Sequence, residues 1–210
     1  QTWSSYHDNR VDFLTTAIKF DNNLVKQIKH FVGGSRKNFK SVNLFKLIDE
    51  IKPKKIIEMG CNNGLYTFAC STYGPSIGID YDKNAINQAN ILNKKFKTNC
   101  TFLHFDLLNE KKINEAFGKN GCYGDVTERF KSELLIAPAI IHHLFNQCKS
   151  TDKIIKIFTL FCSKYMIIEQ IPNTVPEKSL FSSLKKYNWD VIKQVQSTPF
   201  PRKWLLCVKN

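Results

Sequence analysis

Hydrophobic and polar positions divide the chain into a helical N-terminal part and a longer part in which short apolar runs alternate with helix-length segments. Apolar residues recur at helical spacing over 11–32 and again over 41–51, where Ser41 is a candidate cap and Pro53 follows the last apolar position. These patterns predict two helices. We therefore expect an N-terminal helical extension over 1–40 and a single α/β domain over 41–210.

Short runs rich in β-branched residues predict strands over 54–60, 75–80, 100–106, 133–138 and 164–171, with helices over about 64–73 and 82–92. Apolar strands that alternate with helices pair in parallel, and both faces of such a sheet are covered. The runs 189–196 and 203–209 are separated by a short Pro-containing segment and predict an antiparallel pair. The expected fold is α/β: a Rossmann-like, seven-stranded, mostly parallel sheet with an antiparallel C-terminal hairpin and helices on both faces.

Composition narrows the class of protein. With 210 residues, 42% of them hydrophobic, the chain can bury one ordinary core and is not a disordered or collagenous sequence. We find no run of about 18 apolar residues and no apolar core of a secretory signal near the N-terminus. We expect a soluble, cytoplasmic protein without membrane insertion. The seven cysteines are scattered and never form a C-x-x-C pair, which argues against a disulfide framework and a zinc site.

The net charge of +13 would ordinarily indicate an anionic partner such as nucleic acid. However, only four of the 31 basic residues are arginines, and the lysines are spread along the chain. A solvated lysine-rich surface is therefore the simpler interpretation. Nucleic-acid binding stays open as a less favoured alternative.

The segment IIEMGCNNG joins a buried strand to a helix through the pattern Glu58-x-Gly60-x-x-x-Gly64. A tight strand-to-helix turn that lets a ligand approach the backbone requires residues without a Cβ atom. About 20 residues later the next strand ends at Asp80, whose carboxylate suits the two hydroxyls of a ribose. Asp82 fits better as the cap of the following helix.

Two later segments add polar side chains at strand ends. Asp106 and Leu107 follow the third strand, where an acidic side chain can meet an adenine amino group and an apolar neighbour can pack on the ring. The run 133–144, ELLIAPAIIHHL, places His142 and His143 at a strand exit. We expect one imidazole to face the cleft, with His142 favoured, and the other to pack. Adjacent histidines lack metal-ligand spacing, so we expect no metal.

The glycine loop resembles the first motif of class I S-adenosylmethionine (SAM)-dependent methyltransferases. Together with TWSSYH at 2–7, TERF at 127–130, IIEQIP at 167–172 and the terminal PRKWLLCVKN, it resembles the nodulation-type, host-specificity methyltransferase family along most of the chain. Glu133 and Pro138 depart from that pattern. The resemblance implies SAM as cofactor and S-adenosylhomocysteine (SAH) as product. The cofactor-binding residues that it implies are Glu58, Gly60, Cys61, Asn62, Gly64, Asp80, Tyr81, Asp106, Leu107 and Ala137.

The resemblance also implies methyl transfer to an oxygen of a small-molecule or saccharide-type acceptor. His142 or His143 would remove the acceptor proton, and Glu169 would border the acceptor site. The substrate-binding residues Trp3, Tyr6 and His7 would form a lid, although a disordered tail or simple packing of this segment against the body is nearly as well supported. Two alternatives remain: an RNA methyltransferase, and a non-catalytic SAM-binding subunit of a larger assembly. The sequence leaves the oligomeric state open.

Overall fold

The computed structural model describes residues 39–109, 129–197 and 201–210. These ranges hold most of the predicted α/β domain. The helix predicted over 11–32, the predicted lid residues Trp3, Tyr6 and His7, and nearly all of the predicted 1–40 extension lie outside the described residues.

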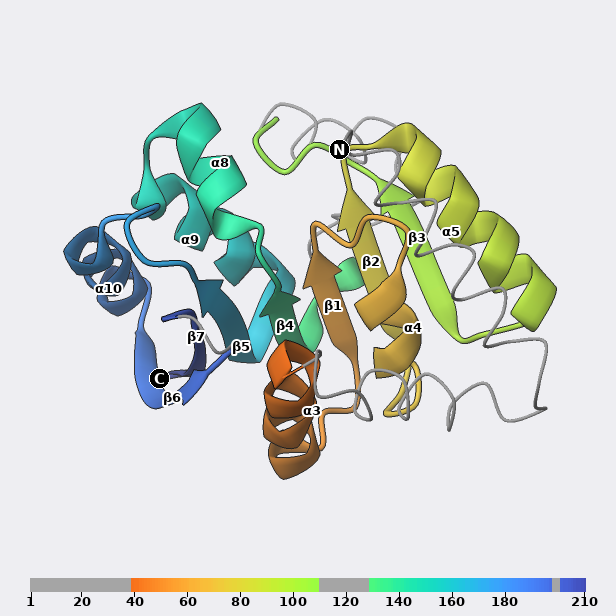
Figure 1. Ribbon diagram of the computed structural model, residues 1–210, viewed down its shortest axis with the longest axis horizontal. Helices are drawn as coiled ribbons and strands as arrows, with labels where there is room; N and C mark the ends of the chain where they lie inside the picture. Colours follow the sequence, from red (N-terminus) through yellow and green to blue (C-terminus); the bar gives the residue numbers. More distant parts are fainter. Residues whose placement is uncertain (1–38, 110–128, 198–200) are drawn as a thin grey trace.

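Seven strands form one sheet in the order β3-β2-β1-β4-β5-β7-β6. Neighbours among β1 to β5 run parallel, whereas β7 runs antiparallel to both β5 and β6. The predicted mixed sheet with its C-terminal hairpin is therefore confirmed (Figure 1). The strands are β1 Ile56–Met59, β2 Ser76–Asp80, β3 Cys100–His104, β4 Ser132–Ala137, β5 Cys162–Gln170, β6 Trp189–Gln196 and β7 Lys203–Lys209.

Helices cover both faces of the sheet, as predicted. The described helices are α3 Phe39–Ile51, α4 Leu65–Cys70, α5 Lys83–Phe96, α8 Ile141–Cys148, α9 Thr151–Phe161 and α10 Glu177–Lys186. One apolar cluster joins the sheet to α3, α4 and α5, and a second joins it to α8, α9 and α10. We call these two sides the α4 face and the α9 face. None of the described helices is long and apolar enough to cross a bilayer.

Three element boundaries differ from the sequence predictions. Helix α3 is described from Phe39 onward, so Ser41 lies inside the helix. Helix α4 ends at Cys70, because the backbone of Thr72 and Tyr73 turns back on Ala69 and Cys70 with i→i−3 hydrogen bonds. Strand β3 ends at His104, two residues earlier than predicted. Asp106 therefore lies in the loop that follows the strand.

Asp82 caps α5, as the sequence indicated. Its Oδ1 accepts hydrogen bonds from the backbone N–H groups of Asn84 and Ala85, at 2.8 and 3.3 Å. Two of the free donors of the first helical turn are thereby satisfied.

Replacing this cap should lower the stability of the domain. We expect Asp82→Ala to reduce the free energy of unfolding by about 1 kcal/mol, because two N–H groups at the start of α5 lose their acceptor. Asp82→Asn keeps an acceptor oxygen and should cost only a few tenths of that amount. Urea denaturation of the two variants and the wild type measures the difference. Equal stability of Asp82→Ala and the wild type would contradict the capping role.

Candidate functional site

The loop between β1 and α4 is folded against the end of β2. The N–H groups of Gly60 and Cys61 both donate to the carbonyl oxygen of Ile79, at 2.8 and 3.0 Å. Gly60 and Gly64 have φ values of 71° and 88°, in the left-handed region that glycine adopts without steric cost. Asn62 also has a positive φ, 51°, which asparagine tolerates better than most residues.

Neither glycine of the loop has room for a side chain. A Cβ atom on Gly60 would lie 2.7 Å from Cδ1 of Ile140, and one on Gly64 would lie 2.5 Å from Cε1 of Phe102. Ile140 belongs to the connection after β4 and Phe102 to β3. The glycines therefore let two neighbouring segments pack directly against the loop backbone.

Asp80 ties this loop to β2. Its Oδ2 accepts the N–H of Asn62 at 2.7 Å, and its Oδ1 accepts the N–H of Asp82 at 2.9 Å. The side chain is only 8% exposed. A carboxylate offers about four lone-pair positions, so each oxygen can accept a further hydrogen bond beyond the two made here. Asp80 thus lies where the sequence predicted a ribose ligand, and that role stays a prediction.

Glu58 lies buried beneath the loop. Its Oε2 accepts the hydroxyl of Thr67 from α4 at 2.5 Å. Burial, followed by the nearby carboxylates of Glu58 and Asp80, raises the pKa of the Cys61 thiol well above its ordinary value. Cys61 is therefore a protonated, buried side chain of the loop at neutral pH and no nucleophile.

Asn63 is a residue that sequence reasoning missed. Its side chain is fully buried, and neither polar atom of the amide has a hydrogen-bond partner within the described part of the chain. An unpaired buried amide costs on the order of 1–3 kcal/mol, which a polar ligand in the loop would recover. The doubled asparagine inside the glycine motif was the available signal, but nothing in the sequence pattern indicates that Asn63 is buried.

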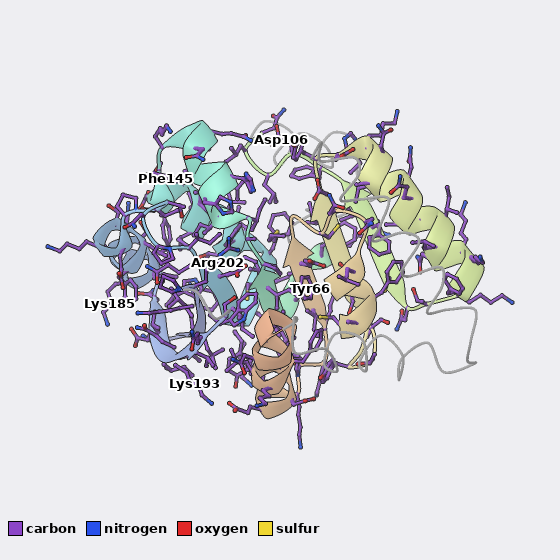
Figure 2. The ribbon with its side chains drawn as sticks, in the orientation of Figure 1. Tyr66, Asp106, Phe145, Lys185, Lys193 and Arg202 are labelled. Carbon is purple, nitrogen blue, oxygen red and sulfur yellow. The ribbon has the colours of Figure 1, made fainter. Side chains whose placement is uncertain are left out.

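Residues expected around an adenine ring follow the ends of β2 and β3. Tyr81 is 69% exposed, and its carbonyl oxygen lies 2.9 Å from Nε2 of His104. Leu107 is buried, whereas Asp106 is exposed and its Oδ1 accepts the N–H of Leu108 at 2.9 Å. Figure 2 shows Asp106 in the loop beyond the end of β3. The predicted groups thus gather at the carboxyl ends of β2 and β3.

The histidine pair lies on a helix and not at the end of a strand, which corrects the sequence interpretation. β4 ends at the buried Ala137, because Pro138 has no N–H for the strand ladder and Ala139 adopts a φ of 52°. His142 and His143 then occupy the first turn of α8. Their ring centroids are 4.0 Å apart, with His142 partly buried and His143 exposed.

Glu133, one of the two residues that depart from the family pattern, lies at the amino end of β4. Its carboxylate accepts the N–H of Lys54 at 2.8 Å and lies 3.5 Å from Nζ of Lys164. Because this is the opposite edge of the sheet from the glycine loop, the substitution does not alter the candidate site.

Glu169 is a buried carboxylate near the carboxyl end of β5. Its Oε1 accepts the hydroxyl of Ser197 at 2.6 Å and lies 3.9 Å from a guanidinium nitrogen of Arg202. Strand pairing joins Met59 to Ile79, Glu58 to Ile136 and Ala137 to Ile168. Continued by one residue for the first and third pairs and by two for the second, this register places Asp80, Gly60, Pro138 and Glu169 in one row across the sheet. Three interstrand spacings of about 4.8 Å then separate Asp80 and Glu169 by roughly 14 Å.

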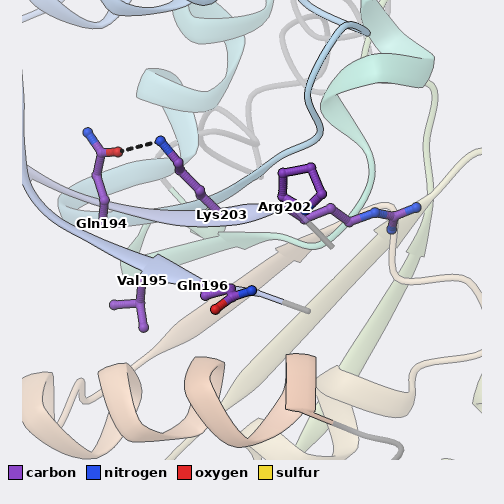
Figure 3. Close-up of a pocket in the computed structure, with 6 residues that line it drawn as sticks. Gln194, Val195, Gln196, Arg202 and Lys203 are labelled. Carbon is purple, nitrogen blue, oxygen red and sulfur yellow. Dashed lines mark hydrogen bonds between the residues drawn. The ribbon is translucent and has the colours of Figure 1, made fainter. Parts of the chain in front are cut away.

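A shallow hollow lies at the connected end of the β6–β7 hairpin rather than over the glycine loop. Its volume is about 290 Å³, and none of the residues that the sequence predicted for the site lines it. The lining residues are Gln194, Val195, Gln196, Pro201, Arg202 and Lys203 (Figure 3). The described residues contain no group of three or more His, Cys, Asp or Glu side chains that could hold a metal ion.

Comparison with known sequences gives one partial match. No protein-family profile matches the chain. A segment of 95 residues, 44% of the chain, is 30% identical to the nodulation protein NoeA of Rhizobium meliloti (strain 1021). The match spans about a fifth of NoeA, 20% of its length. It agrees with the nodulation-type resemblance seen in the motifs.

Solved structures with a similar fold include several methyltransferases. A TehB-like SAM-dependent methyltransferase from Corynebacterium glutamicum matches with a TM-score of 0.62 at 11% identity, over 99% of this chain and 97% of that one. Magnesium protoporphyrin IX methyltransferase from Synechocystis PCC 6803, solved with bound SAM, gives 0.61 at 14% identity, over 91% and 85%. The N-methyltransferase NodS from Bradyrhizobium japonicum WM9 gives 0.58 at 11% identity, over 83% and 98%. The chain therefore has the class I SAM-dependent methyltransferase fold that its motifs predicted.

Proposed function

We propose that the protein is a SAM-dependent methyltransferase that acts on an oxygen of a small-molecule or saccharide-type acceptor. The observation that carries the proposal is the carboxylate of Asp80 hydrogen-bonded to the glycine loop at the carboxyl ends of β1 and β2. In open α/β sheets, ligands bind outside these strand ends, where the strand order reverses. β1 is such a position, because the chain proceeds from it to β2 and β3 on one side and to β4 on the other.

Several residues of this chain fit a bound SAM. The remaining lone pairs of Asp80 can accept the ribose hydroxyls, and the buried amide of Asn63 offers polar atoms without a partner in the described chain. Tyr81, Asp106 and Leu107 would surround the adenine. Glu58 and Ala137 would support the loop from beneath and from β4. A similar structure contains SAM, which agrees with this assignment.

The cofactor supplies an electrophilic methyl group on sulfur, and the protein has to orient the acceptor and accept its proton. An imidazole is suited to that proton transfer near neutral pH. His142 and His143 are the candidate bases, because they follow β4 directly and lie in the first turn of α8. Glu169 would border the acceptor, and Trp3, Tyr6 and His7 would close over it. Free thiols at six described cysteines are consistent with a reducing, cytoplasmic location, which the proposal includes.

Titration calorimetry with SAM and SAH tests the cofactor site. We expect the wild type to bind with micromolar affinity and Asp80→Ala to weaken binding by roughly 1.5–3 kcal/mol, because hydrogen bonds to a charged group are lost. Asp82→Ala is the matched control, since it removes the same charge two residues away and should leave SAH affinity unchanged. Lack of binding by folded wild-type protein would contradict the proposal and favour a structural role for the loop.

Turnover of the histidine variants tests the base. Once an acceptor supports methylation, we expect His142→Ala or His143→Ala to lower kcat by about 10²-fold or more, while SAH affinity stays unchanged. The assignment is wrong if both alanine variants turn over near the wild-type rate.

A further inference from the structure

Arg202 lies close to Glu169, one of the residues predicted for the acceptor site. It directly precedes β7, and Lys203 pairs with Gln170, so Arg202 lies at the carboxyl edge of the sheet beside β5. Its single charged contact among the described residues is with Oε1 of Glu169 at 3.9 Å, which is too long for a hydrogen bond. Within the described part of the chain, no hydrogen bond is made by its guanidinium.

The carboxylate of Glu169 attracts this guanidinium without forming a hydrogen bond. The carboxylate is completely buried and is fixed by the hydroxyl of Ser197 at 2.6 Å, whereas the Arg202 side chain is 39% exposed. An arginine has five N–H donors in a planar fork, and the long contact with Glu169 occupies none of them well. Arg202 therefore lies beside a fixed carboxylate and has donors that the described residues leave unused.

The neighbouring lysine does not share this arrangement. Nζ of Lys203 donates to Oε1 of Gln194 at 3.4 Å, and Figure 3 shows Arg202 extending away from that pair. Arg202 also lines the 290 Å³ hollow at the end of the hairpin, so solvent-filled space adjoins it. The N–H donors that remain available to a ligand thus belong to Arg202. This residue lies at the carboxyl edge of the sheet, where the candidate site is.

We propose that Arg202, positioned by Glu169, binds an oxyanion carried by the methyl acceptor. The inference rests on the proposed methyltransferase function and narrows its acceptor to anionic molecules, such as a sugar acid or a sugar phosphate. A planar guanidinium matches the two oxygens of a carboxylate or phosphate, which the point charge of a lysine does not. The net charge of +13 also favours the approach of an anionic acceptor.

A purely structural role for Arg202 makes different predictions. If Arg202 only neutralises the buried Glu169, the protein has no preference for anionic ligands. Removing both charges then removes the ion pair and leaves ligand binding unchanged. If Arg202 binds an oxyanion, the protein prefers anionic ligands, and this preference disappears when the arginine is replaced.

The test is calorimetric titration of the full chain, first with SAH and then, in its presence, with glucuronate, glucose 6-phosphate and glucose. We expect one or both anionic sugars to bind at least tenfold more tightly than glucose, and the better one identifies carboxylate or phosphate as the ligand group. Arg202→Gln should weaken that binding at least tenfold. Arg129→Gln, the same change at the opposite edge of the sheet, should leave it unchanged.

Two further variants allow for a folding defect in Arg202→Gln, which removes the cation beside the buried Glu169. Glu169→Gln combined with Arg202→Gln removes both charges and should bind SAH like the wild type, without preference for the anionic sugars. Arg202→Lys keeps the charge, should unfold at the wild-type temperature, and should weaken anion binding about fivefold. SAH binding without any preference for anionic sugars would overturn this inference alone, whereas absence of SAH binding would overturn the proposed function.

Discussion

The hydrogen bonds of the Asp80 carboxylate are the constraint on which the candidate site depends. They join the N–H of Asn62, in the loop after β1, to the N–H of Asp82, at the start of α5, through one buried side chain. The arrangement also requires Gly78 in β2, because a Cβ atom there would lie 2.7 Å from both Cys61 Sγ and Thr67 Oγ1. The ends of β1 and β2 and the starts of α4 and α5 are thereby held together before any ligand binds.

Buried carboxylates on the α4 face are each compensated in a different way. Glu58 accepts a hydroxyl, Asp80 accepts two backbone N–H groups, and Glu169 accepts a hydroxyl beside a distant guanidinium. These hydrogen bonds fix the positions of the three carboxylates. The side chains that keep hydrogen-bonding groups for a ligand are their neighbours, namely the amide of Asn63 and the guanidinium of Arg202.

The sequence predicted the order of elements better than their ends or their long-range contacts. Periodicity and β-branched runs identify the strands, and Asp82 is recognisable as a cap because capping is a local interaction. The end of β3 at His104 and the helical position of His142 depend on chain turns that hydrophobic patterning does not report. The approach of Arg202 to Glu169 joins residues 33 positions apart, and no periodic pattern in the sequence records such a contact.

The turn after β4 connects the glycine loop with the histidine pair. Pro138 ends the strand, and Ile140 then serves two purposes: its side chain fills the space above Gly60, and its carbonyl oxygen accepts the N–H groups of His143 and Leu144 at 3.0 and 3.1 Å. The start of α8 is therefore fixed against the loop by direct packing. Pro138, which departs from the pattern of similar methyltransferases, thus contributes to the geometry that sets the distance between the loop and the two imidazoles.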